Sequence, residues 1–305
     1  MSGTKHHFHE FLYAGHILCG IEEKDGRTVL IRLLDILKKN FPDLDIEFAT
    51  REVLAREELF PTMVAPGLAV PHARIPELSE PLVAMACAPQ GVEFNTEVPI
   101  RVMILLLSPL DEPDLHMQLL TALAGDFGKP DAIEKVSRMG SAQEVLSYFS
   151  GNQVRIPDYL KAHDLMDSRA VTLRETDTMR DAIERFATTG ESEIAVLDND
   201  GDLRGVISLS DLLKFSLPEH LLWLEDLSPI YQFQPFSDML KTASDTRIAD
   251  VMREDFMTVD QGVPAVQLAK LFLVDKVSQL IITDETGRFA GVVRLKDFSA
   301  KLFWE

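Results

Sequence analysis

Cysteine is scarce in this sequence, and the two cysteines show no paired spacing. Cys19 and Cys87 stand far apart in a chain of 305 residues, and no CxxC motif is present. Two unpatterned cysteines argue against a disulfide framework and suit a reducing compartment, so we expect a cytoplasmic protein. Cys87 ends the apolar run Leu82–Cys87, which favours a place in the core over a chemical role.

Long hydrophobic runs and an excess of basic residues are also missing. No run reaches the roughly eighteen apolar residues of a membrane span, and the first residues lack the apolar segment of a signal peptide. We therefore expect neither membrane insertion nor export. Lys and Arg number 30 against 49 Asp and Glu, which gives a formal net charge of −19. Since nucleic-acid binding needs a basic face, no nucleic-acid partner is expected.

Motifs of common hydrolases and metal enzymes are absent too, including GxSxG and HExxH. Four histidines, His6, His7, His9 and His16, gather near the start, but no set of cysteine or carboxylate ligands accompanies them. We predict that this stretch is disordered or lies on the surface, and we predict no metal site.

The sequence does contain enough apolar material for two or three globular domains, with 46% hydrophobic and 26% charged residues. Apolar residues recur at three and four from Asp25 to Asn40, which predicts a helix, and a second helix is expected from about Glu47 to Glu58. Further elements are predicted as strands around Ala69, Met85 and Ile104, a helix that starts near Asp111, and a helix over Ala142–Phe149.

An apolar run ends abruptly at Pro71-His72, which sets an imidazole at the tip of a predicted strand. Proline fixes its own φ, and loops on a rigid scaffold often carry function. A histidine that merely caps a strand is the simpler alternative for His72 alone. Arg56 lies 16 residues upstream near a helix end, and for Arg56 alone pairing with Glu52 on a solvated helix face is the simpler reading. His116 lies 44 residues downstream in the first turn of a helix, where free N–H groups favour an anion.

The segment around His72 resembles the signature of the fructose- and mannitol-type enzyme IIA domains of the bacterial phosphotransferase system, a group that includes nitrogen-regulatory proteins. The matched positions are Glu57, Val64, Ala65, Leu68, Ala69, Val70, Pro71, His72 and Ala73. The resemblance implies that His72 accepts a phosphoryl group and that Arg56 and His116 belong to the same catalytic site. The usual glycine-rich loop is replaced here by the stiffer stretch 61–66.

The second half of the sequence contains an internal repeat with an offset of 86 residues. Five residues recur without a gap: Met166, Thr172, Gly201, Gly205 and Asp211 return as Met252, Thr258, Gly287, Gly291 and Asp297. Five identities at one offset indicate a duplicated unit. Each copy is expected to form a short strand, a helix, a β-hairpin and another helix.

This repeat resembles a tandem pair of CBS domains, also called a Bateman module, which implies a binding site for adenosine nucleotides. Ser208 and Asp211 could clasp the ribose hydroxyls in the first copy, although Ser208 could equally cap the next helix. In the second copy Arg294 replaces the hydroxyl while Asp297 stays, so that cleft is expected to be altered. AMP, ADP, ATP and S-adenosylmethionine are the candidate regulatory ligands, and no cofactor is expected to be required. The charge of −19 favours AMP or an adenosyl compound unless Arg294, Arg169 or Arg204 meets the phosphates.

The sequence therefore predicts an α/β fold with an enzyme IIA-type sandwich around a mixed sheet at 1–152. Two CBS repeats of α+β type are expected at 158–216 and 245–305, packed as a pair, with a linker at 217–244. The expected function is that of a regulatory phosphohistidine carrier, and phosphoryl transfer is the expected chemistry. Its partners would be a phospho-HPr-like donor, a IIB-type acceptor or regulated protein, and a second copy of the chain in a homodimer. The alternative is a non-catalytic nucleotide sensor.

Overall fold

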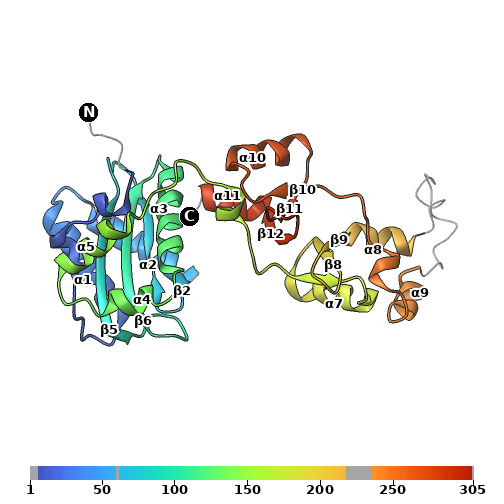
Figure 1. Cartoon of the computed structure of the whole chain (residues 1–305), viewed down its shortest axis with the longest axis horizontal. Coiled ribbons are helices and arrows are strands. Elements are labelled where there is room, and N and C mark those ends of the chain that lie inside the picture. Colours follow the sequence, from blue (N-terminus) through green and yellow to red (C-terminus); the bar gives the residue numbers. More distant parts are fainter. Residues whose placement is uncertain (1–5, 60–61, 218–234, 304–305) are drawn as a thin grey trace. The chain divides into compact units, whose positions relative to one another are not determined.

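The computed structural model describes residues 6–59, 62–217 and 235–303, which form two compact units (Figure 1). The first unit takes the chain up to Leu160 together with the residues from Ser299 onward, and the second spans Lys161–Phe298. Pro61 in the loop before His72, and most of the linker proposed for 217–244, lie outside the described residues. Every helix within the described residues is too short or too polar to span a membrane.

The first unit is built on a six-stranded mixed sheet. The strands are β1 (Ile17–Leu18), β2 (Met63–Ala65), β3 (Leu68–Ala69), β4 (His72–Ile75), β5 (Leu82–Val92) and β6 (Ile100–Pro109). Their order is β1-β5-β6-β3-β2, and β4 pairs in parallel with β6 beyond the end of β3. The pairing of β5 with β6 is antiparallel, whereas β1 runs parallel to β5 and β3 runs parallel to β6.

Helices cover both faces of this sheet (Figure 1). The helices of the first unit are α1 (Gly26–Asn40), α2 (Ile46–Leu59), α3 (Pro113–Phe127), α4 (Ala132–Ser137) and α5 (Ala142–Asn152). Side chains of β5 alternate between the two cores, since Met85 packs with α3 and α5 while Ala84 packs with α1 and α2. Strand β6 is buried on both faces, as its continuous apolar run predicts.

Local signals in the sequence set the bounds of α1. The carboxylate of Asp25 accepts hydrogen bonds from the backbone N–H groups of Arg27 and Thr28, which caps the helix. Lys38 and Lys39 lie in the last turn, where they suit the negative end of the helix dipole. The predicted helix from Asp25 to Asn40 is therefore confirmed.

The prediction that the histidine-rich start is disordered or lies on the surface agrees with the exposed His6, but it is wrong for Phe8, Phe11 and His16, which are buried. Phe8 is fully buried and its ring lies 5.1 Å from that of Phe149, and His16 is buried as well. The backbone N–H of Phe8 donates to the carbonyl oxygen of Val154, which holds this segment to the end of the same unit. The clustered histidines concealed the apolar spacing of Phe8 and Phe11, which is typical of a buried turn.

The second unit contains the two predicted repeats, each with a three-stranded sheet. The first repeat has α6 (Ala162–Leu165), β7 (Thr172–Arg174), α7 (Met179–Thr189), β8 (Glu193–Leu197), β9 (Leu203–Ser208) and α8 (Leu209–Ser216). The second has a 3-10 turn (Ile248–Asp250), β10 (Thr258–Asp260), α10 (Ala265–Val274), β11 (Gln279–Thr283), β12 (Phe289–Arg294) and α11 (Leu295–Phe303), of which the residues after Phe298 are grouped with the first unit. Helix α9 (Pro235–Thr242) precedes the second repeat, and the strand orders are β7-β8-β9 and β10-β11-β12.

In each repeat, the segment before the first strand crosses to the sheet of the other repeat. Arg253, at the start of the second repeat, forms an antiparallel bridge with Val206 of β9, and Asp167 forms the equivalent bridge with Val292 of β12. Asp167 and Arg253 are related by the offset of 86 residues, and so are Val206 and Val292, so the exchange is symmetric. Ala195, Val206 and Ile281 share one buried cluster between the repeats. The predicted packing of the repeats as a pair is thus present in this unit.

Candidate active site and candidate nucleotide cleft

His72 is the first residue of β4, directly after Pro71, and not the last residue of a strand as expected. The carbonyl oxygen of Pro71 accepts a hydrogen bond of 3.0 Å from the N–H of Leu106 on β6, which fixes the backbone beside the ring. The ring Nδ1 lies 2.7 Å from the carbonyl oxygen of Val70. Because a carbonyl oxygen only accepts, Nδ1 must carry the proton and Nε2 must hold the lone pair.

His116 lies near the start of α3 and is completely buried. Its ring centroid is 5.1 Å from that of His72, and its Nδ1 is 2.5 Å from the hydroxyl oxygen of Ser108. Within the described part of the chain, Nε2 of His72 and Nε2 of His116 are both buried without a hydrogen-bond partner. Buried polar atoms are normally satisfied, so two such atoms in neighbouring rings indicate a place for a ligand group.

Burial and positive charge keep both rings neutral. Desolvation lowers the pKa of His72 to about 4 against the opposing effect of the Val70 hydrogen bond, and Arg56 and Arg74 lower it further. Burial also lowers the pKa of His116 well below its usual value, with contributions from His72, Arg74 and Arg56. The site therefore combines two neutral imidazoles with a positive field, which suits an incoming dianionic group.

A carboxyl group of α2 supports the segment that leads to His72. Glu57 is 3% exposed and accepts hydrogen bonds from the backbone N–H of Thr62, at 3.3 Å, and from the Thr62 hydroxyl. Burial raises the pKa of Glu57 to about 7, which outweighs the lowering by Thr62 and Arg56. The carbonyl oxygen of Thr62 in turn accepts from the N–H of Val70, whose own carbonyl holds His72.

The structure brings together His72 and His116 as the sequence suggests, and it places Arg56 within electrostatic reach of both rings. Glu52, the partner considered for Arg56, lies 3.1 Å from Arg51. Sequence reasoning missed Arg74 and Ser108. Arg74 could have been found from its place two residues beyond His72, on the same face of a strand, and Ser108 from its position as the polar residue that ends an apolar run.

In the first repeat, Ser208 and Asp211 form a capping box at the start of α8. The carboxylate of Asp211 accepts from the N–H and the hydroxyl of Ser208, and its N–H donates to the Ser208 hydroxyl. Arg253 from the second repeat donates to the same carboxylate oxygen at 3.0 Å. Burial alone would raise the pKa of Asp211, but the bonds from Ser208 and Arg253 hold it below its usual value.

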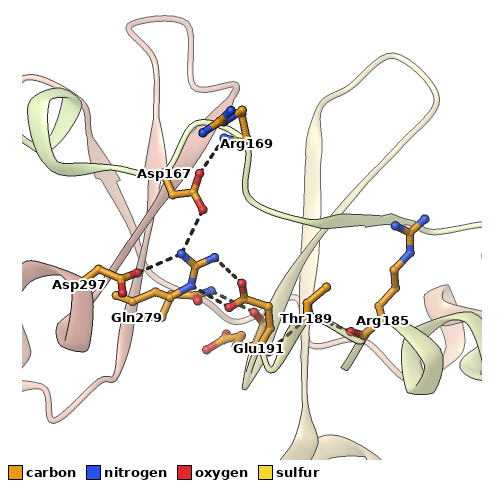
Figure 2. Close-up of polar contacts among 9 residues, drawn as sticks. Asp167, Arg169, Arg185, Thr189, Glu191, Gln279 and Asp297 are labelled. Atoms are coloured by element: carbon orange, nitrogen blue, oxygen red, sulfur yellow. Dashed lines mark hydrogen bonds and ion pairs between the residues drawn. The ribbon is translucent and has the colours of Figure 1, made fainter. Parts of the chain in front are cut away.

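In the second repeat, Arg294 is engaged by three carboxylates. Figure 2 shows Asp167, Glu191 and Asp297 directed at one guanidinium group. Arg294 donates to Glu191 through Nε at 2.7 Å and through Nη2, and to Asp167 and Asp297 through Nη1 at 3.2 and 3.1 Å. Its side chain is 12% exposed, and these partners raise its pKa despite burial.

The two repeats carry equivalent ion-pair clusters with exchanged charges. The offset of 86 residues places Arg253 at the position of Asp167, and Arg294 at the position of Ser208. The arginine therefore comes from the segment before the first strand in one cluster and from the end of the hairpin in the other. Arg204 lies 3.7 Å from Glu175, so it joins neither cluster. Among the described residues no group of three side chains that could hold a metal ion is present.

Two protein families match this chain. The profile described as phosphoenolpyruvate-dependent sugar phosphotransferase system, EIIA 2, matches residues 10–152, and the CBS domain profile matches 162–218 and 248–303. A fructose-specific EIIA component of Haloferax volcanii is 31% identical over 103 residues, which cover 33% of this chain and 67% of that protein. A nitrogen regulatory protein of Pseudomonas aeruginosa is 23% identical over 136 residues, or 44% of this chain and 88% of that protein.

The C-terminal half has relatives of its own. A CBS domain-containing protein of Dictyostelium discoideum is 27% identical over 133 residues, which cover 44% of this chain and 84% of that protein. The histidine pair lies in the region of the first match, and both ion-pair clusters lie in the region of the second. The chain therefore belongs to the EIIA type 2 family of the phosphoenolpyruvate-dependent sugar phosphotransferase system and carries a pair of CBS domains behind its EIIA domain.

Proposed function

We propose that the EIIA domain is a phosphohistidine carrier that accepts a phosphoryl group on Nε2 of His72. The observation that carries this proposal is a buried, unprotonated Nε2 beside His116, in the field of Arg56 and Arg74. The first match, to proteins named as EIIA components and nitrogen regulatory proteins, supports the same reaction. A phospho-HPr-like protein is the proposed donor.

The transfer balances without any further reactant. The lone pair of His72 Nε2 attacks phosphorus, an N–P bond forms there, and the N–P bond of the donor phosphohistidine breaks. The donor ring, protonated on its other nitrogen, keeps the electron pair and leaves as a neutral imidazole. His72 keeps its Nδ1 proton on the Val70 carbonyl throughout, so the acceptor needs no base.

The charge that spreads over the phosphoryl oxygens in the transition state needs donors around it. Arg56 and Arg74 provide positive charge that acts on both histidine rings. Arginine suits this role because its planar guanidinium donates two parallel hydrogen bonds to a phosphate. His116 completes the group of donors if its Nε2 carries a proton.

Incubation with phosphoenolpyruvate, enzyme I and HPr tests the carrier role. We expect one phosphoryl group per chain by intact mass, stable in alkali and lost in acid, and we expect His72→Ala to abolish the label. His116→Ala should still accept phosphate, with transfer slowed by about 10²–10³-fold because one charge-stabilising donor is lost. His163→Ala, an exposed histidine of the second unit, is the matched control. Undiminished labelling of His72→Ala would contradict the proposal.

The same experiment separates the carrier from its rival, a non-catalytic sensor. A carrier passes the group to a IIB-type domain or to a regulated protein within the time of turnover. A sensor that only presents its state to a partner keeps the label until the phosphohistidine hydrolyses. A chase of labelled protein with a IIB domain gives the answer directly.

We further propose that the CBS pair binds an adenosine-containing ligand in the first cleft and thereby sets the output of the carrier. Oδ2 of Asp211 is occupied by Ser208 and Arg253, while Oδ1 faces the Lys214 ammonium at 3.9 Å. A ribose would therefore bind at Oδ1 or displace Arg253. The three carboxylates around Arg294 make the second cleft less suited to a phosphate.

Calorimetric titration with AMP, ADP, ATP and S-adenosylmethionine tests this second proposal. Asp211→Ala should weaken the ligand that binds by roughly ten- to a hundredfold, because ribose hydroxyls lose their acceptor. Asp200→Ala, an exposed carboxylate in the hairpin of the same repeat, is the control. Circular dichroism of each variant excludes a folding defect. Absence of binding by the unaltered protein would leave the pair as a dimerisation element, which sedimentation would reveal as a homodimer.

A further inference from the structure

Ser108 lies beside the candidate active site and has no role in the function proposed so far. It belongs to β6, is fully buried, and places its hydroxyl oxygen 2.5 Å from Nδ1 of His116. Among residues 6–59, 62–217 and 235–303, His116 is the one hydrogen-bond partner of this hydroxyl. The contact can form in two directions, and they have opposite consequences for the free nitrogen of His116.

The burial of Ser108 decides between the two directions. If Nδ1 of His116 carried the proton and donated to Ser108, the hydroxyl hydrogen of Ser108 would need another acceptor. Leaving that hydrogen unsatisfied in a buried site carries a desolvation penalty that the other direction avoids. If the hydroxyl donates to Nδ1 instead, each atom of the contact is satisfied. The arrangement in which the Ser108 hydroxyl donates to Nδ1 of His116 is therefore the more stable one.

We infer that Ser108 is a positioning residue that holds His116 in the tautomer with its proton on Nε2. The ring of His116 then offers an N–H donor toward the place where His72 would carry its phosphoryl group. The tautomer follows from this contact alone, while its use in transfer rests on the proposed carrier function.

The two rings are thus held in opposite tautomers by two different neighbours. A carbonyl oxygen, that of Val70, accepts from Nδ1 of His72 and leaves a lone pair on Nε2. A hydroxyl, that of Ser108, donates to Nδ1 of His116 and leaves a proton on Nε2. With the centroids 5.1 Å apart, two lone pairs would repel the anionic oxygens between them, whereas one lone pair and one donor match a phosphoryl group.

Nitrogen-15 NMR of the imidazole rings in the unphosphorylated full chain tests the tautomer. We expect the Nε2–H form for His116 and the Nδ1–H form for His72. Ser108→Ala should give His116 a mixture of both tautomers, and Ser108→Thr should restore the Nε2–H form because it keeps the hydroxyl. Ser137→Ala is the matched control, since Ser137 is equally buried but donates to the carbonyl oxygen of Glu134.

Phosphoryl transfer gives the second measurement. Ser108→Ala should lower kcat by about tenfold with little change in the KM for the donor protein, which is less than the loss of a whole donor. A merely structural role would instead leave the His116 tautomer unchanged and lower the stability as Ser137→Ala does. An unchanged Nε2–H tautomer in Ser108→Ala, or an Nδ1–H tautomer in the unaltered protein, would overturn the inference. Failure of the unaltered chain to take a phosphoryl group would overturn the carrier function and leave the tautomer result standing.

Discussion

Neutral rings buried next to arginines set the chemistry at the scale of single residues. A histidine with its usual pKa would be partly protonated near pH 6.5, and a protonated ring cannot attack phosphorus. Burial and the arginines lower the pKa of His72 to about 4. We therefore expect the fraction of His72 rings that are neutral, and so able to accept a phosphoryl group, to stay constant across neutral pH. The His72 ring destabilises the folded state as pH falls from 6.5 toward 4, because the ring takes up a proton in the unfolded chain but not in the folded one.

Glu57 gives a pH dependence of the opposite sign, which leads to a prediction. Its folded pKa of about 7 exceeds the ordinary value of 4.5, so the folded state binds more protons between these values. Its contribution to stability is complete below pH 4.5 and is lost as pH rises through 7. Glu57→Gln removes this titration. Between pH 5 and pH 8 its free energy of unfolding should therefore fall by about 1–3 kcal/mol less than that of the unaltered protein.

Urea unfolding at several pH values, followed by circular dichroism, measures this difference. Glu58→Gln is the control because Glu58 is the exposed neighbour on the same helix. The titration of His72 is common to all three proteins and cancels in the comparison. Parallel stability profiles for Glu57→Gln and the unaltered chain would show that Glu57 is ionised in the folded state.

At the scale of elements, the structure explains why glycine recurs at the same positions in both repeats. A Cβ atom on Gly291 would lie 2.6 Å from the carbonyl oxygen of Asp167, and one on Gly205 would lie 2.8 Å from that of Arg253. These are the residues whose backbones cross from one repeat to the other. Gly201 and Gly287 recur for another reason, because their φ values of +84° and +83° suit the hairpin turns.

Gly291→Ala should therefore weaken the contact between the repeats. The methyl group meets backbone atoms that cannot rotate away, so we expect a loss of about 1–3 kcal/mol in the unfolding free energy of the CBS pair. Gly262→Ala is the control, since its methyl group would meet only the tip of the Asp260 side chain. Thermal unfolding monitored in both variants measures the effect, and equal midpoints would contradict the crossing geometry.

Patterns confined to one segment could be predicted from the sequence, and long-range pairings could not. The helix from Asp25 and the buried strand β6 were visible locally, and the period of 86 residues needed only a comparison of the sequence with itself. The contact of Arg253 with Asp211, and that of Ser108 with His116, join residues whose proximity depends on the tertiary fold. Cys19 illustrates the same limit, because it follows Leu18, which pairs with Ala86, the neighbour of Cys87, despite their distance in sequence.

At the scale of the molecule, the second unit is a pair whose halves complete each other. Gln279 donates through its amide to the carbonyl oxygen of Glu193, and Arg294 takes two of its three carboxylate partners from the first repeat. A single repeat would leave the guanidinium with Asp297 alone and would expose the apolar side chain of Ile281. A buried ion pair that loses a partner costs about 3–5 kcal/mol, more than a unit of this size can spare.

Residues 241–305 expressed alone should consequently be poorly folded or should associate with a second copy that replaces the missing repeat. Residues 158–305, which contain both repeats, are the control and should fold on their own because they hold both bridges and both ion-pair clusters. Nuclear magnetic resonance line widths and sedimentation distinguish a folded monomer, a dimer and an unfolded chain. A stable monomer from residues 241–305 would show that the exchanged segments are not needed for the fold of a repeat.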